Sequence, residues 1–251
     1  MQDKVCVITG GAGSVGRAAA RALLDAGARV WLVDRQEEAL RAAAHDLNAG
    51  ARAAWAVADV SDGAQTRACL QGAHAHWSRP IDFMFCNAGI NGAIAPIADY
   101  PEDVFDAVMR VNVRGAFLAL KHGFPLLADG ASVLINASVV AVTADPGIAA
   151  YATSKHALVG LMRVAAKEGA ARGIRVNVIA PGPIANDFQA DVERRLSAVV
   201  GRDATQMLDG MIPLGRHGRP EEIAQMVLFL ASTRSSFSTG GVFMADGGMH
   251  I

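Results

Sequence analysis

The sequence predicts an α/β fold in which one doubly wound parallel sheet is covered by helices on both faces, within a single domain of residues 1–251. Three observations lead to this prediction. Short, continuously apolar runs alternate with alanine- and leucine-rich helical stretches, a glycine-rich turn follows the first apolar run, and no linker or low-complexity segment divides the 251 residues. Apolar strands that alternate with helices are typical of a parallel sheet buried on both faces.

The expected elements follow one another along the chain. The expected strands are residues 4–8, 29–33, 53–58, 81–86, 132–136, 175–179 and 241–245. The expected helices are residues 15–26, 37–49, 102–121, 151–172 and 221–231. Residues 183–216 form an irregular stretch, and an insertion past the carboxyl end of a strand overhangs the ligand crevice of such a sheet. We therefore expect a substrate lid there, with a solvated surface excursion as the alternative.

Composition and charge narrow the classes of function. The chain is 52% hydrophobic and 19% charged, which suits a large buried core. Its net charge of −1 gives no general attraction to nucleic acid or to an anionic membrane surface. No apolar stretch approaches the length of a membrane span. The three cysteines lack paired metal-ligand spacing, so we expect reduced thiols in a cytoplasmic protein and no metal at the active site.

A glycine-rich turn joins the first strand to the first helix in the segment Thr9–Gly16, which reads TGGAGSVG. Glycines allow a tight turn and close backbone approach, while the free N–H groups and the dipole of the helix favour a phosphate. The strand–turn–helix context makes the glycines at 11, 13 and 16 more informative than the string alone. We expect this turn to hold the pyrophosphate of a dinucleotide, with a purely structural turn as the alternative.

An acidic side chain ends the second strand and bears on the choice of cofactor. Asp34 stands eighteen residues after Gly16, where a carboxylate accepts hydrogen bonds from the adenosine ribose. It would repel the extra phosphate of NADP, which favours NAD(H), although Arg35 and Arg17 offset that repulsion if they lie close, so NADP(H) stays open. Asp59, after the third strand, is placed to meet the adenine amino group or to cap the next helix.

Tyr151 and Lys155 stand four residues apart at the start of a helical stretch, which places a phenol and an ammonium on one face. Lowering a tyrosine pKa by 2–3 units from its usual value near 10 requires about 3–4 kcal/mol. Two unit charges about 4 Å apart interact by roughly 4 kcal/mol at an effective dielectric near 20. The pair therefore suits proton transfer, with a chance pairing on a solvated helix as the alternative.

Several motifs recur in one order along the chain. They are the Thr9–Gly16 turn, Asn87-Ala88-Gly89 after the fourth strand, Asn112 within Val-Asn-Val-Arg-Gly, Ser138 thirteen residues before Tyr151, Lys155, Pro181-Gly182 after the sixth strand, and the ending Ala-Asp-Gly-Gly at 245–248. Together they resemble the short-chain dehydrogenase/reductase family over essentially the whole chain. The chain departs from the family pattern at Ser14, where a glycine is usual, and at Asn186, which stands near the place of a threonine. Ser14 is also a candidate helix cap.

The resemblance implies a Rossmann-like fold and the interconversion of a secondary alcohol and a ketone. Ser138 would orient the substrate oxygen, and Tyr151 would transfer the proton. Lys155 would lower the tyrosine pKa and hold the nicotinamide ribose, while Asn112 would support a water that relays protons to Lys155. The implied cofactor-binding residues are Gly10, Gly13, Ser14, Val15, Gly16, Asp34, Asp59, Val60, Asn87, Gly89, Tyr151, Lys155, Pro181, Gly182 and Ile184. Structural alternatives are a strand-end hydroxyl for Ser138, a helix-bending amide for Asn112 and a tie between strands for Asn87.

The substrate side of the expected site is apolar. The candidate lining residues are Ile94, Val139, Val140, Phe188, Met207 and Met211, which favour a neutral, rather apolar ketone or secondary alcohol. Methionines also commonly fill gaps in a core. Asp145 and Arg114 are the ionisable candidates, each with a cap or surface charge as its alternative.

Three functions remain in view. The leading one is an NAD(H)-dependent alcohol dehydrogenase or ketone reductase. An epimerase or dehydratase of related architecture is disfavoured by the short chain, and a catalytically silent nucleotide-binding regulator has no need for the four catalytic candidates. The resemblance also implies a homotetramer that packs through helices 102–121 and 151–172 and the final strand.

Overall fold

A seven-stranded parallel sheet forms the centre of the computed structural model, which describes residues 1–251. The strands are β1 Val5–Thr9, β2 Arg29–Asp34, β3 Ala53–Val57, β4 Ile81–Cys86, β5 Leu127–Asn136, β6 Arg175–Pro181 and β7 Val242–Ala245. Their order is β3-β2-β1-β4-β5-β6-β7, and every neighbouring pair is parallel. The order reverses between β1 and β4, where ligands bind in open α/β sheets.

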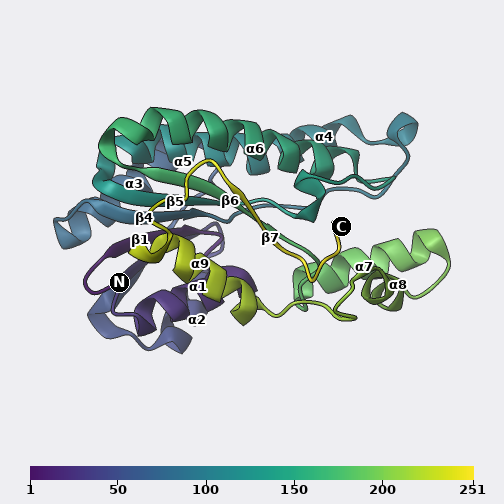
Figure 1. The fold of residues 1–251 in the computed structure, drawn as a ribbon, viewed down its shortest axis with the longest axis horizontal. Helices are drawn as coiled ribbons and strands as arrows, with labels where there is room; N and C mark the ends of the chain where they lie inside the picture. Colours follow the sequence, from purple (N-terminus) through teal and green to yellow (C-terminus); the bar gives the residue numbers. More distant parts are fainter.

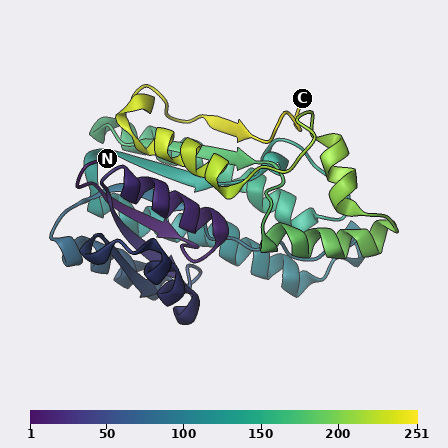
Figure 2. The ribbon, with the colours of Figure 1, turned by 90° about the horizontal axis from the view of Figure 1, so that it is seen from below.

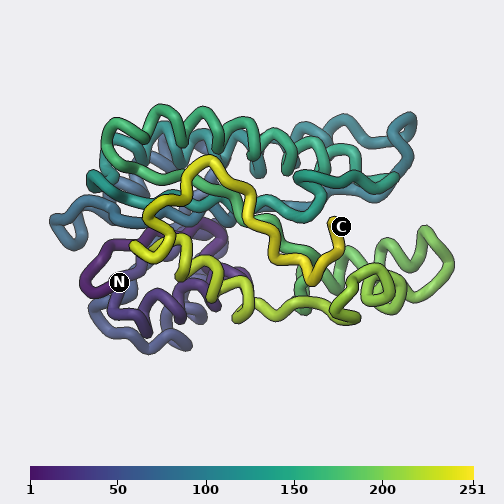
Figure 3. Tube along the Cα trace, in the orientation of Figure 1, coloured from purple at the N-terminus to yellow at the C-terminus, as the bar shows by residue number.

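Helices cover both faces of the sheet, so the molecule has three layers (Figures 1 and 2). The helices are α1 Ser14–Asp25, α2 Glu37–Leu47, α3 Gly63–Trp77, α4 Glu102–Val108, α5 Gly115–Gly123, α6 Ala149–Gly169, α7 Asp187–Val200, α8 Ala204–Met211 and α9 Pro220–Ala231. Helices α3, α5 and α6 lie on one face, and α1, α2 and α9 lie on the other. The α7–α8 pair extends beyond the sheet at the end where the chain terminates (Figure 3).

The continuously apolar strands arise because both faces of the sheet are buried. Successive side chains of a strand point to opposite faces, so Val5 and Val7 enter the core under α3, α5 and α6. Cys6 and Ile8 enter the second core, under α1 and α9. All four side chains are fully buried. The predicted α/β fold with a doubly wound parallel sheet is therefore confirmed.

Several predicted boundaries were wrong. Strand β5 begins at Leu127, five residues before the expected start at Ser132, and its register with β4 shifts within that extension. The expected helix 102–121 consists of α4, a π-helical turn at Met109–Arg114 and α5. The sequence analysis did not place helix α3.

The stretch 183–216 is largely helical instead of irregular. Each of its two helices begins at a side-chain cap: Asn186 Oδ1 accepts from Gln189 N at 2.8 Å, and Asp203 Oδ1 accepts from Thr205 N at 2.9 Å. Helix α7 also carries an apolar stripe at four-residue spacing, formed by Phe188, Val192, Leu196 and Val200. A cap followed by such a stripe is a helix signal that the sequence analysis missed.

Candidate active site

The glycine turn after β1 requires glycine at two positions. Gly10 has a φ of +62°, and a Cβ added to Gly16 would lie 2.3 Å from the Gly10 carbonyl oxygen. A Cβ at Gly13 would lie 3.5 Å from the same oxygen, an ordinary contact distance. Gly13 is the N-cap of α1, and no side chain caps this helix, so the alternative of a capping role for Ser14 was wrong. The first N–H groups of α1 are free to bind an anion.

Asp34 is fixed beside this turn. One carboxylate oxygen accepts a hydrogen bond from Ala12 N at 3.2 Å, and the other accepts from Arg35 N at 2.8 Å. Arg17 forms an ion pair with Asp46, which occupies its guanidinium. The carboxylate of Asp34 therefore keeps its negative charge at the end of β2 without compensation from Arg17.

Asp59 does not cap helix α3. Its Oδ1 accepts from Ser61 N at 2.8 Å, whereas Asp62 caps the helix by accepting two backbone N–H groups. The alternative of a helix-capping role for Asp59 was therefore wrong. Val60 packs against the backbone of Gly115, where an added Cβ would lie 2.9 Å from Val60 Cγ2. The adenine contact expected of Asp59 and Val60 stays a prediction.

A network of polar groups ties the ends of three strands together. Thr9 Oγ1 accepts from Asn87 N at 3.0 Å and from Ala88 N at 3.2 Å. Asn87 Nδ2 donates to Gly10 O at 3.1 Å, and Asn136 Nδ2 donates to Asn87 Oδ1 at 2.8 Å. Asn87 therefore links β1 to β5, as its structural alternative proposed. Thr9 and Asn136 were not predicted, although each is a polar residue that ends an apolar strand.

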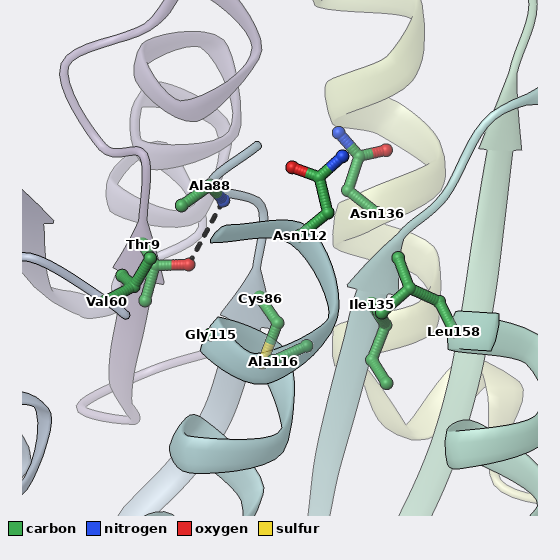
Figure 4. A pocket seen from close by; sticks show the side chains of 10 residues that line it. All are labelled: Thr9, Val60, Cys86, Ala88, Asn112, Gly115, Ala116, Ile135, Asn136 and Leu158. Carbon is green, nitrogen blue, oxygen red and sulfur yellow. Dashed lines mark hydrogen bonds between the residues drawn. The ribbon is translucent and has the colours of Figure 1, made fainter. Parts of the chain in front are cut away.

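Asn112 lies in the π-helical turn between α4 and α5 and is 2% exposed. Its amide accepts from Ile90 N at 2.8 Å and donates to Ile90 O at 2.9 Å and to Ser154 Oγ at 3.0 Å. A Cβ added to Gly89 would lie 3.2 Å from Asn112 Oδ1 and 3.6 Å from Lys155 Nζ. The Asn112 side chain therefore positions the 89–90 backbone in front of Lys155. Figure 4 shows Asn112 and Asn136 beside a cavity of about 10 Å³, room for about one water.

The phenol and ammonium predicted for proton transfer lie together. Lys155 is 4% exposed, its Nζ donates to Asn136 O at 2.8 Å, and Nζ lies 5.3 Å from the centroid of the Tyr151 ring. The Tyr151 hydroxyl forms a hydrogen bond with Ser138. Strand β5 and the loop after it supply Asn136 and Ser138, and the first turns of α6 supply the other two groups.

The titration of this pair differs from the sequence-based expectation. Burial raises the pKa of Tyr151, and the hydrogen bond with Ser138 opposes this only in part. Burial also lowers the pKa of Lys155 to about 8. Both groups lose water, and Nζ bonds a neutral carbonyl, so desolvation outweighs the attraction that would stabilise the phenolate. Burial in this structure opposes the expected lowering of the Tyr151 pKa by Lys155, and that role of Lys155 stays a prediction.

A cavity of about 500 Å³ opens above Ser138 and Tyr151. All six predicted apolar lining residues border it, as do Asp145 and the predicted cofactor residues Val15, Pro181, Gly182 and Ile184. Arg114 is not among the lining residues, and no lysine, arginine or histidine is. Helices α7 and α8 supply eight of the lining side chains: Phe188, Gln189, Val192, Leu196, Val200, Met207, Leu208 and Met211.

A buried histidine joins the two helices that cover this cavity. His217 precedes α9, and its Nε2 lies 2.5 Å from Glu193 Oε1 while its Nδ1 lies 2.7 Å from Asp209 Oδ1. Burial disfavours the charged imidazole, but the hydrogen bonds and charges of Asp209 and Glu193 outweigh it, so the pKa of His217 is raised. Thr205 Oγ1 also donates to Glu193 Oε2 at 2.6 Å. The protonated imidazole satisfies both carboxylates at once.

No helix has the length and apolar character that crossing a membrane requires. No group of three or more histidine, cysteine, aspartate or glutamate side chains is arranged to hold a metal ion.

The sequence is similar to known oxidoreductases along its whole length. A family model described as Enoyl-(Acyl carrier protein) reductase matches residues 10–250. The chain is 39% identical to "Inactive 2-(S)-hydroxypropyl-CoM dehydrogenase 2" of Xanthobacter autotrophicus over 92% of this chain and 98% of that protein. It is 36% identical to the levodione reductase of Leifsonia aquatica over 98% of this chain and 94% of that protein.

Solved structures share the fold closely. A crystal structure of levodione reductase matches with a TM-score of 0.94 at 36% identity, covering 100% of this chain and 98% of that one. NAD⁺-bound xylitol dehydrogenase matches with a TM-score of 0.93 at 34% identity, covering 98% and 99%. A metagenomic blue fluorescent protein in complex with NADPH matches with a TM-score of 0.89 at 32% identity, covering 100% and 99%.

The histidine contact predicts a pH-dependent α7–α8 segment. A group whose pKa is raised on folding stabilises the fold below its unfolded pKa and loses that contribution as the pH rises through its folded pKa. Hydrogen-exchange protection of α7 and α8, corrected for intrinsic exchange rates, should therefore fall as the pH rises above the ordinary histidine pKa of about 6.5 and through the raised pKa of His217. His217→Gln should remove this dependence, whereas the exposed His45→Gln should keep it. Equal pH dependence in all three proteins would contradict the assignment.

Proposed function

Because the chain belongs to the short-chain dehydrogenase/reductase family and is an oxidoreductase that acts on CH–OH groups, we propose that it is an NAD(H)-dependent enzyme that interconverts a small, rather apolar secondary alcohol and its ketone. One observation carries this proposal. Ser138 and Tyr151 line a cavity that also borders residues of the glycine turn and of the Pro181-Gly182 segment, and the buried Nζ of Lys155 lies 5.3 Å from the centroid of the Tyr151 ring.

The three side chains have distinct roles in the proposed reaction. A bound nicotinamide supplies the hydride chemistry. Ser138 donates a hydrogen bond to the substrate oxygen, and Tyr151 gives that oxygen a proton in reduction or removes one in oxidation. Lys155 uses one donor for Asn136 O, which leaves two for the nicotinamide ribose and for a path that returns the proton to Tyr151.

The residues present suit a dinucleotide. Gly16 leaves the backbone open where a side chain would fill the turn, and a Cβ at Gly182 would lie 2.9 Å from Asp246 Cα. Gly89 likewise permits close approach in front of Lys155. The uncompensated charge of Asp34 supports NAD(H) over NADP(H), since a phosphate near it would be repelled. One related structure holds NAD⁺ and another holds NADPH, so the cofactor preference has to be measured on this protein itself.

The cavity supports a neutral substrate. Its lining is predominantly apolar, and its ionisable members are Tyr151 and the exposed Asp145 at the rim. An anionic substrate would meet a carboxylate and no cation there. Two relatives are named levodione reductase and xylitol dehydrogenase, one for a reduction and the other for an oxidation.

The rival functions are separated by one assay. A catalytically silent protein is a real competitor, since one relative is called inactive. NADH absorbance should be followed while ketones and secondary alcohols are screened in both directions. Net oxidation or reduction supports the proposal, product without net cofactor change supports an epimerase or dehydratase, and cofactor binding without turnover supports a silent regulator.

We also propose a homotetramer in the cytoplasm. Phe117 on α5 and Val164 on α6 are exposed apolar side chains on the helices through which family members would pack, and Phe237 next to β7 is fully exposed. Three unpaired cysteines, buried in the core, suit a reducing compartment.

The first prediction concerns the proton donor. Tyr151→Phe should lower kcat by about 10²–10⁴-fold, because it removes the acid–base group but keeps the ring. Binding of NADH, followed by fluorescence, should change little. Tyr100→Phe removes the other phenol hydroxyl, which bonds the backbone of Ala93 in the cavity-lining loop, and should therefore change KM more than kcat. Activity of Tyr151→Phe within about tenfold of the natural protein would exclude the proposed role.

The second prediction concerns cofactor choice. Two like charges near 4 Å repel by about 1–4 kcal/mol between bulk water and a partly buried site, so kcat/KM should favour NADH over NADPH by roughly tenfold or more. Asp34→Asn keeps the shape and removes the charge, and should bring the two values closer. Higher turnover with NADPH in the natural protein would refute the NAD(H) preference.

The third prediction concerns assembly. Light scattering coupled to size-exclusion chromatography should give about four times the chain mass of 26.1 kDa. Phe237→Ser should shift the distribution toward smaller species if this exposed ring lies in an interface. A monomer at working concentration would overturn the tetramer.

A further inference from the structure

Asn91 is an amide that the protein leaves without a partner. It is 8% exposed, it makes no hydrogen bond to the protein, and its Nδ2 is buried. Buried polar side chains nearly always have a partner, and one without a partner calls for an explanation. Asn91 also lines the large cavity, together with Ser138 and Tyr151. The protein supplies no partner, so we assign the missing one to a ligand in this cavity, toward which the carboxamide turns.

The loop that carries Asn91 is held on both sides. Asn112 bonds both backbone groups of Ile90, and Arg195 Nη1 of α7 donates to Gly92 O at 2.7 Å. The Tyr100 hydroxyl bonds the backbone of Ala93, at 3.1 Å from its N and 3.3 Å from its O. Asn91 is thus the residue of this loop whose polar side chain makes no hydrogen bond to the protein. A group on a fixed backbone is already placed for binding, which limits the entropy lost when a ligand is held.

Among the other neutral amides of the lining, Asn136 donates through Nδ2 to Asn87 at 2.8 Å, although its buried Oδ1 also has no partner. Asn186 uses Oδ1 to cap α7, and Gln189 Nε2 donates to Glu193 Oε1 at 2.9 Å. The carboxamide of Asn91 both donates and accepts, so a carbonyl or a hydroxyl oxygen suits it equally. Most of the other side chains that line the cavity are apolar, so they offer a substrate oxygen few other hydrogen-bond partners.

We propose that Asn91 determines specificity by binding a second, neutral oxygen of the substrate, remote from the carbon that is oxidised or reduced. The substrate class is therefore a diketone or a hydroxyketone, or the corresponding diol. This inference rests on the proposed oxidoreductase function. A site built to bond a substrate oxygen discriminates against an analogue that lacks it, because its own polar group is then left unpaired.

The test compares two six-membered ring ketones of similar size, cyclohexane-1,4-dione and 4-methylcyclohexanone. We expect kcat/KM with NADH to favour the dione by roughly tenfold or more in the natural protein, after correction for its two equivalent carbonyls. Asn91→Leu keeps the size of the side chain without its polar atoms, and should bring the ratio close to one. Asn91→Ala serves if the leucine variant folds poorly, as judged by thermal unfolding and NADH binding.

The outcomes separate this inference from the proposed function. An unchanged ratio in the variants, or no preference in the natural protein, would overturn the role of Asn91 while leaving the oxidoreductase in place. If neither ketone is reduced and no alcohol is oxidised, the proposed function fails. Calorimetry with cyclohexane-1,4-dione in the presence of NADH then decides the remaining point: weaker binding by Asn91→Leu supports the contact, and equal binding contradicts it.

Discussion

The site depends on one hydrogen bond, from Lys155 Nζ to the backbone carbonyl of Asn136 at 2.8 Å. This bond holds an almost fully buried ammonium at the carboxyl end of β5 and so fixes the first turns of α6 against the sheet. The Asn136 side chain then bonds Asn87, which bonds Gly10 in the glycine turn. The acid–base pair and the dinucleotide turn are thereby joined through a short chain of polar contacts, which rigid elements position more accurately than loops do.

Burying Tyr151 and Lys155 together shifts the pKa of both groups. Burial lowers the pKa of Lys155 to about 8 and raises that of Tyr151, so each group is pushed toward its neutral form. A neutral phenol is the form that donates a proton to a carbonyl, and a lysine with a pKa near 8 exchanges protons readily near neutral pH. In this environment the neutral form of Tyr151 is favoured over the phenolate. Oxidation needs an additional positive charge near Tyr151 to stabilise the phenolate.

The sequence predicted the groups that carry chemistry better than it predicted the surfaces that select a substrate. The succession of strands and helices along the chain, the glycine turn, Asp34 and the Tyr151/Lys155 pair follow from spacing, because a helical turn or a strand end fixes where such residues point. Burial raises the pKa of Tyr151, and this burial comes from segments that are distant in the sequence. No local sequence pattern predicts it. The sequence likewise does not show that the amide of Asn91 lacks a hydrogen-bond partner, because only the fold determines which polar groups meet.

Substrate selection and catalysis occupy different parts of the molecule but are mechanically linked. The proposed catalytic groups come from α6 and from the loop after β5, whereas α7, α8 and the 89–96 loop supply ten of the 26 residues that line the cavity. Arg195 connects the latter two, because it bonds Gly92 O from α7, and His217 connects α7 to α8 through two carboxylates. Motion of α7 must therefore either break the Arg195 bond or carry the loop next to Asn91 with it. Closure over a substrate would then set the position of the amide that contacts it, and the same movement that excludes water would also sharpen selection.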